Sequence, residues 1–343
     1  MRALKWKRLK RVKNRKIMNF MAECLRTAPE KVFLDPYRPA LTSQLEEASN
    51  VAMLALLPAR EEIDNLVTTM ILRPLCRGLN RRVATMMGRM HHEGAYLQHG
   101  TTYESADGGG SSFVQKHLTS LYESLSTTYL AKLPPRYSLL VGSTVSLFSV
   151  FTFLSNASLI RPLGEDAKLH LTQDLADFEL IVDQFMARAG GSVESKALSE
   201  IGNGKAYAEL RAMRQMLFWT GLDDTSKPAT AVAKSILREV WVRDMRPSTV
   251  FHYLFSFAPK LLSSPHHWKR MRVDEYVGTL VSLDGDTEEG ESIDWMTTMQ
   301  CCDSYQQRES AQSALIGKTG SEGDPRIAAI LLALGPELLR RRR

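Results

Sequence analysis

The stretch that comes nearest to a ligand-binding motif is LIGKTGS at residues 315–321. A phosphate-binding loop needs a second glycine five residues before the glycine that precedes its lysine, because a tight glycine-rich loop aims its backbone N–H groups at the phosphates. Gly317 precedes Lys318, but Gln312 occupies the position of that earlier glycine, and no strand pattern comes before it. The sequence therefore predicts no nucleotide-binding loop here.

The histidines do not form a metal-binding set. His91, His92 and His99 fall in a glycine-rich stretch, and His266 and His267 fall in a turn that follows a proline. None has the HExxH spacing of a zinc protease, and no cysteine completes a zinc set. We therefore expect solvated loop histidines. Since GxSxG and GxGxxG motifs are missing too, the sequence predicts no catalytic, cofactor-binding or metal residue, and a protein that is not an enzyme.

The four cysteines, Cys24, Cys76, Cys301 and Cys302, show no CxxC spacing and no disulfide framework of a secreted protein. Such sparse cysteines suit a reducing compartment. The basic start also lacks the apolar region and cleavage site of a signal peptide. We therefore expect the chain to stay in the cytosol.

Positive charge is concentrated at the two ends of the chain. Nine Lys and Arg lie within residues 1–16 and four Arg close the chain, so that without these the net charge of +6 becomes −7 for residues 17–339. A folded nucleic-acid reader carries its basic patch on its body, so this distribution argues against one. The ends are expected to be solvated, although clustered Lys and Arg also fit an anionic lipid surface.

One stretch must be weighed as a membrane span. Residues 137–160 contain no charged residue, and as a helix of 24 residues they would measure roughly 36 Å, longer than a bilayer core of about 30 Å. The stretch nevertheless has two faces: Gly142, Ser149, Thr152 and Asn156 lie on one, and Leu140, Leu147, Phe151 and Leu154 on the other. This pattern favours a helix buried among other helices.

Helical spacing of apolar residues recurs along the chain, and sustained strand-like alternation does not. We predict an all-α protein, built as an elongated array of helical bundles. Four regions are expected: a basic tail at 1–16, an N-terminal helical bundle at 17–90, a flexible linker at 91–112 and a C-terminal helical region at 113–343.

Two prolines should interrupt the N-terminal bundle. A helix over 40–57 is expected to end at Pro58, and a second one, from 59 to about 90, should kink or divide at Pro74. In the second helix Arg73, Arg77 and Arg81 recur at every fourth residue. That row fits either a solvated face or a docking face for an acidic partner helix.

Residues 156–182 predict a hairpin of two helices. Pro162 disfavours helical backbone at the residue before it, and Gly164 can accept a positive φ, so a helix must end there. Glu165 and Asp166 then fall in the first turn of the next helix, where the helix dipole favours negative charge. Its packing seam has spacings of 4, 3, 4 and 3, and consists of Leu171, Leu175, Phe178, Val182 and Phe185.

Three stretches carry a family resemblance: SFVQKHLTSL, SLIRPLGEDAKLHLTQDLADFELIV and FHYLFSFAPKLLSSP. They resemble the C-terminal part of the subunit 5 family of the conserved oligomeric Golgi complex, a helical-rod tethering complex. A weaker similarity extends to DPRIAAILLALGPELL, so that the resemblance covers about residues 110–340.

The resemblance implies a non-catalytic subunit that supports vesicle tethering and retrograde transport within the Golgi, peripheral on the cytosolic face of its membranes. It implies contacts with other subunits, the seventh above all, and with membrane-fusion proteins and small GTPases. It implies no cofactor and no nucleic acid. The alternative is a generic helical scaffold or adaptor whose basic ends bind anionic membrane or RNA.

Overall fold

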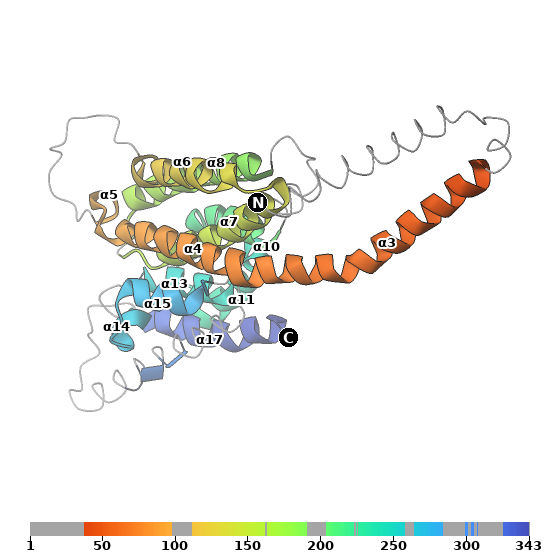
Figure 1. Ribbon diagram of the computed structural model, residues 1–343. Helices are drawn as coiled ribbons and strands as arrows, with labels where there is room; N and C mark the ends of the chain where they lie inside the picture. Colours follow the sequence, from red (N-terminus) through yellow and green to blue (C-terminus); the bar gives the residue numbers. More distant parts are fainter. Residues whose placement is uncertain are drawn as a thin grey trace. The chain divides into compact units, whose positions relative to one another are not determined.

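The computed structural model describes residues 38–97, 112–190 except 162, 204–257 except 223 and 225, 264–283 and 325–342, with five further residues between 299 and 307. Every regular element in these residues is helical, which confirms the predicted all-α class (Figure 1). The chain divides into two compact units, Met1–Arg73 and Pro74–Arg343, and each is described by itself. The predicted boundaries of the four regions stay predictions.

The first unit contains one long helix, α3 (Arg38–Val67), which runs into a π-helical turn, η1 (Thr68–Leu72). Pro58 lies inside α3, so the prediction that the helix ends there is wrong. Its neighbours from Leu56 to Arg60 are exposed. A proline inside a helix removes one backbone hydrogen bond and bends the helix, and an exposed helix can continue past it. Figure 1 shows α3 bent along its length.

The predicted disruption at Pro74 is confirmed, in the form of η1. The amide of Arg73 bonds to the carbonyl of Thr68, five residues back instead of four. A proline ring clashes with the carbonyl four residues before it, which here belongs to Met70, and the wider π turn relieves that clash.

The second unit, which we call the body, is a bundle of helices whose core runs along its whole length. Its elements are α4 (Arg73–Met87), η2 (Gly88–His92), α5 (Gly94–Leu97), η3 (Val114–Leu118), α6 (Thr119–Thr128), η4 (Leu130–Lys132), α7 (Pro135–Ser158), α8 (Glu165–Gly190), α10 (Lys205–Leu217), α11 (Ala229–Arg238), α12 (Trp241–Asp244), α13 (Pro247–Phe255), α14 (Pro265–Trp268), α15 (Val273–Leu280) and α17 (Pro325–Arg342). Among them α7 has the central place, because α8, α10, α13 and α15 all pack against it.

Helices α7 and α8 form the predicted antiparallel hairpin. All five residues of the predicted seam on α8 are buried. Phe178 of that seam stacks on Phe153 of α7, with ring centroids 4.3 Å apart. Near the other end of the pair, a Cβ built on Gly142 would lie 2.4 Å from the Cβ of Ala189. Glycine is therefore what allows the two backbones to approach at this crossing.

The small and polar face of α7 is buried, and its apolar face is buried only in part. Gly142, Ser149, Thr152 and Asn156 are all buried. On the opposite face Leu140 and Leu147 are 41% and 37% exposed, whereas Phe151 and Leu154 are buried, because the second half of α7 is covered on both faces. Two of these buried polar side chains form hydrogen bonds within α7. Ser149 donates to the carbonyl of Val145 at 2.6 Å, and the side-chain amide of Asn156 donates to the carbonyl of Thr152.

Helix α7 is also the one candidate for a membrane span by length and hydropathy in the described part of the chain, and 72% of its most apolar window is buried within the protein. Burial of this extent is what a core helix shows. The finding agrees with the sequence interpretation of residues 137–160 as a helix that packs among other helices.

The connection between α7 and α8 is confirmed in outline and corrected at one residue. The first helix ends at Ser158, and Glu165 and Asp166 lie in the first turn of α8. Gly164, however, does not adopt a positive φ, and a Cβ placed on it would meet no atom within 4 Å. The expectation of a left-handed glycine is therefore wrong, because α7 already ends at Ser158, six residues before Gly164, and its end does not need a positive φ there.

The other predicted segments fall partly outside the described residues. The spacing of apolar residues also predicts helices over 17–27 and about 292–314, and these lie wholly or largely outside the described residues, as do residues 1–16. It predicts one further helix near 229–243, and that segment is divided into α11 and α12, because Glu239 between them has extended backbone. Of the predicted linker 91–112, residues 91–92 belong to η2 and residues 94–97 to α5, and the Tyr96 side chain is 2% exposed.

We expect Gly142→Ala to destabilise the body although alanine is the better helix former. The added methyl group must displace Ala189, and overpacking of this kind costs about 1–3 kcal/mol against a gain in helix propensity of about 1 kcal/mol. Gly164→Ala is the matched control, since its methyl group enters open space. Urea denaturation followed by circular dichroism compares the two; equal midpoints would contradict the close approach at Gly142.

Candidate functional site: three buried polar junctions

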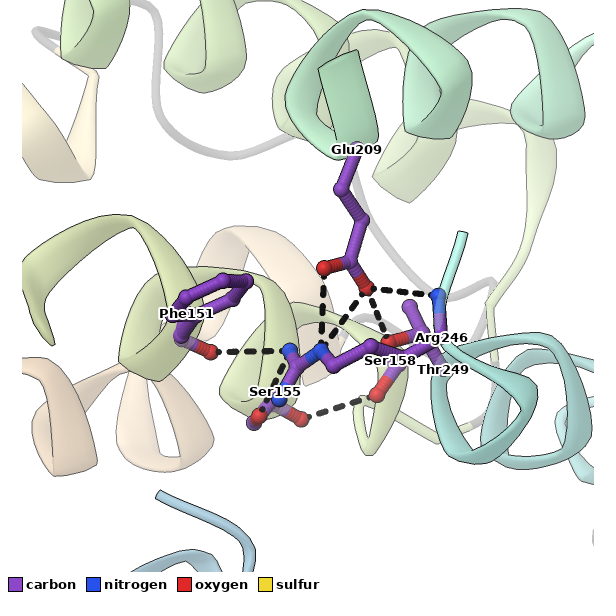
Figure 2. A network of polar contacts seen from close by, with 6 residues as sticks. All are labelled: Phe151, Ser155, Ser158, Glu209, Arg246 and Thr249. Atoms are coloured by element: carbon purple, nitrogen blue, oxygen red, sulfur yellow. Dashed lines mark hydrogen bonds and ion pairs between the residues drawn. The ribbon is translucent and has the colours of Figure 1, made fainter. Parts of the chain in front are cut away.

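The first junction joins three helices of the body through one ion pair (Figure 2). Glu209 of α10 is 1% exposed, and its carboxylate oxygens accept from Arg246 Nε at 3.0 and 2.9 Å. The same carboxylate accepts from the Thr249 hydroxyl at 2.6 Å and from the Arg246 backbone amide at 3.3 Å. The guanidinium continues to α7, where its Nη2 donates to the Phe151 carbonyl at 3.3 Å and to Ser155 Oγ at 3.2 Å.

Local structure explains why Arg246 can reach both partners. It stands immediately before Pro247, in extended backbone at the N-cap of α13, because the residue before a proline is kept out of helical conformation. Its guanidinium lies 4.7 Å from the centroid of the Phe151 ring, which adds a cation–π contact. The side chain therefore binds α10 and α7 from the start of a third helix.

This junction contributes to the specificity of packing more than to net stability. Taking two charges out of water costs several kcal/mol per ion, which their attraction and the added hydrogen bonds largely offset. Removing one partner, in contrast, leaves a buried charge without compensation, at about 3–5 kcal/mol. The Glu209–Arg246 pair thus selects one arrangement of α7, α10 and α13 over alternatives with similar apolar contacts.

The second junction fixes the segments before α6 onto α8. Asp174 is 2% exposed and accepts a hydrogen bond from the Tyr96 hydroxyl and another from the Val114 amide at 3.1 Å. Burial raises the pKa of Asp174, and the two donors oppose that shift. One turn along α8, Asp177 accepts from Ser112 Oγ at 2.7 Å.

The third junction, which we call the basic corner, consists of His91, Arg161, His252, His266 and His267. His91 Nε2 lies 3.0 Å from Asn156 Oδ1 on the last turn of α7. His252 Nε2 lies 2.9 Å from the Tyr276 hydroxyl, and the His266 and Tyr276 ring centroids are 6.2 Å apart.

Two buried histidines of the basic corner are kept neutral by their surroundings. Burial lowers the pKa of His91 to about 4, and the hydrogen bond with Asn156 opposes this lowering. Burial lowers the pKa of His266 to about 3, and the neighbouring bases His267, His91, Arg161 and His252 lower it further.

The expectation of solvated loop histidines is therefore wrong for these two. His266 is 6% exposed and lies against Tyr276 of α15. His91 is partly buried and lies against Asn156 of α7. His92 and His267 are exposed, as expected, and His99 lies outside the described residues. Of the described residues, no group of three or more His, Cys, Asp or Glu is arranged to hold a metal ion.

The remaining predicted features are distributed as follows. LIGKTGS at 315–321 and three of the cysteines, Cys24, Cys301 and Cys302, lie outside the described residues. Cys76 is buried in α4. The row of Arg73, Arg77 and Arg81 is exposed along one helix, which leaves both interpretations of it open.

Sequence reasoning missed Glu209, Arg246 and Asp174. A signal was nevertheless present for the two acids, since each stands on the apolar stripe of its own helix. Asp174 lies three residues after Leu171 and four before Phe178, and Glu209 lies three residues after Ala206. A carboxylate at such a position must be buried with a partner, although the stripe does not identify that partner.

Comparisons with known proteins identify one kind of relative. The chain is 35% identical over 129 residues to the mouse (Mus musculus) protein named conserved oligomeric Golgi complex subunit 5. This match covers 36% of this chain and 13% of the relative. It is 31% identical over 124 residues to the Arabidopsis thaliana subunit 5, covering 36% of this chain and 12% of the relative.

The chain thus matches only about an eighth of the length of these curated relatives. No family model matches the chain, and no solved structure matches it significantly. The resemblance to a part of subunit 5 that the sequence motifs indicated is confirmed.

We expect Glu209→Gln to lower the free energy of unfolding by about 3–5 kcal/mol, because the guanidinium of Arg246 then stays buried opposite a neutral amide. Glu165→Gln is the matched control: Glu165 pairs with Lys168 at 2.7 Å but is itself 85% exposed, so we expect a loss below about 1 kcal/mol. Chemical denaturation measures both, and similar losses would contradict the role given to the buried pair.

The buried histidines predict a loss of stability in acid. Their folded-state pKa values lie below the unfolded value of 6.5, so the unfolded chain binds more protons as the pH falls below 6.5. Above pH 6.5 the two histidines do not lower the free energy of unfolding. As the pH falls from 6.5 toward 4, each of them lowers it by about 1.4 kcal/mol per pH unit.

Replacing His266 by glutamine should therefore flatten the dependence of unfolding free energy on pH between 6.5 and 4.5. The exposed His92→Gln serves as the control and should leave the slope unchanged. Measurements are made in phosphate-free buffers. Parallel curves for wild type and His266→Gln would contradict a neutral buried histidine.

Proposed function

We propose that this chain acts as a non-catalytic subunit, or part of one, in a Golgi vesicle-tethering complex. The observation that carries the proposal is the identity of 35% over 129 residues with subunit 5 of the conserved oligomeric Golgi complex. The independent match to the plant protein of the same name supports it. The all-helical fold agrees with a helical-rod tether, and the three polar junctions position helices rather than reacting groups.

The proposed function works through helix-to-helix contacts, and the first unit offers a surface of the right kind. Leu56, Ile63, Leu66 and Met70 lie on one side of α3 and η1, with spacings of 7, 3 and 4, and are between 42% and 71% exposed. Apolar residues at heptad spacing form the seam into which a second helix inserts its side chains. A surface of this kind supports assembly with another helical protein.

The finer elements of the proposal follow from the resemblance. The complex supports retrograde transport within the Golgi and stays peripheral on the cytosolic face of the membrane. Other subunits of the oligomeric Golgi complex are the partners, the seventh first among them, and membrane-fusion proteins and small GTPases are further ones. A generic scaffold that binds anionic membrane or RNA through its basic ends is not favoured, because both relatives carry the name of one Golgi complex.

The experiment is affinity purification of the full tagged chain from its own cells under mild conditions, followed by mass spectrometry. We expect subunits of the oligomeric Golgi complex to co-purify, the seventh most abundantly. Phe178→Asp places a charge in the α7–α8 core and should abolish recovery, whereas Leu180→Asp, on the exposed side of the same helix, should preserve the fold. Recovery of the wild-type chain alone, or with RNA-binding proteins, would contradict the proposal.

A further inference from the structure

The basic corner brings together five bases from segments that are far apart in the sequence. His91 belongs to η2, Arg161 follows α7, His252 lies on α13, and His266 and His267 belong to α14. The Arg161 guanidinium carbon lies 4.9 Å from the ring centroid of Phe255, one turn after His252 on α13. The two rings of His266 and His267 have centroids 4.2 Å apart. The fold, not the local sequence, therefore creates this concentration of basic side chains.

The five bases of the corner differ in exposure. His252 and His266 are 1% and 6% exposed. His267 is exposed, and Arg161 and His91 are partly buried. The exposed His267 is therefore the member of the corner that solvent reaches most readily.

A buried nitrogen of His266 has no hydrogen-bond partner within the described part of the chain. Nδ1 of His266 is buried and makes no hydrogen bond. A buried polar atom without a partner is destabilising, and proteins usually retain such an atom only where water or a ligand satisfies it. As the N–H tautomer, this nitrogen is a donor that an acceptor-rich ligand can use.

The electrostatic surroundings of His266 favour an anion. After burial, the groups that act on its pKa are His267, His91, Arg161 and His252, and each of them is a base. An anion placed among them would offset their mutual repulsion and would make the charged form of each histidine more favourable.

We propose that the basic corner is a binding site for a phosphate group, either as free phosphate or as the phosphomonoester of a lipid headgroup. A phosphate offers several acceptor oxygens, which suit one planar guanidinium and several imidazole N–H donors at once. The proposal goes beyond the proposed function and does not depend on it.

The test measures the thermal stability and calorimetric binding of the full chain with inorganic phosphate, against sodium chloride of equal ionic strength, at pH 6.5. We expect a saturable rise in melting temperature with phosphate. His267→Gln and Arg161→Gln should each weaken phosphate binding by about tenfold or more, as expected for the loss of a hydrogen bond to a charged group. His267 is exposed, so its replacement should not prevent folding.

His92→Gln is the matched control, because His92 is an exposed histidine next to His91 that the basic corner does not include. It should bind phosphate as the wild type does. The proposal is overturned if phosphate has no effect beyond that of chloride, or if the double variant of Arg161 and His267 binds phosphate as well as the wild type.

Vesicle flotation then distinguishes the two sources of phosphate. Vesicles of phosphatidylcholine with phosphatidic acid are compared with phosphatidylcholine alone. Recruitment by phosphatidic acid that is lost in the double variant supports the site and assigns it to a lipid headgroup. Phosphate binding without recruitment supports the site and assigns it to a free phosphate. Recruitment that the double variant retains, without phosphate binding, overturns the proposal.

Discussion

The close crossing of α7 and α8 is the contact on which the rest of the body depends. Helix α7 is central because α8, α10, α13 and α15 all pack on it, and its Gly142, Ser149, Thr152 and Asn156 are all buried. Small residues bring helix axes close together, so that backbone shape determines the crossing. At Gly142 a Cβ would lie only 2.4 Å from the Cβ of Ala189, so a larger residue there would push the two helices apart. The positions of α10, α13 and α15, which also pack on α7, therefore depend on this crossing.

Buried polar groups add the specificity that apolar packing of helices lacks. Apolar stripes on helices tolerate shifts in register, because one leucine can replace another at similar cost. The pair of Glu209 and Arg246 tolerates no such shift, since its carboxylate and guanidinium bond to atoms of three helices. Asp174 of α8 has the same effect, because it accepts from the Tyr96 hydroxyl and from the Val114 amide. The buried polar groups of this chain thus add to the specificity of its interior packing.

The sequence predicts the packing pattern within a single helix, whereas contacts between residues far apart in the chain are seen only in the structure. The seam of α8 was predictable because its spacing of 4, 3, 4 and 3 is a property of one helix. Glu209 and Arg246 are separated by 37 residues, and Tyr96 and Asp174 by 78, so no local pattern pairs them. The same reason explains the wrong expectation for His91 and His266: each stands in a polar, loop-like context, and only the fold covers it. Pro58 shows the opposite case, because the local pattern predicts a helix end there and α3 nevertheless continues through the proline.

The π turn at the end of α3 limits the kind of helical partner that the first unit can take. The apolar stripe of Leu56, Ile63 and Leu66 keeps heptad spacing within regular α-helix. The turn at Thr68–Leu72 closes its hydrogen bond over five residues instead of four. This adds about one residue to the turn and rotates whatever follows by roughly 100° about the helix axis. A partner helix that follows the stripe in register therefore leaves it at η1, so Met70 is the last residue of the stripe that such a helix can contact.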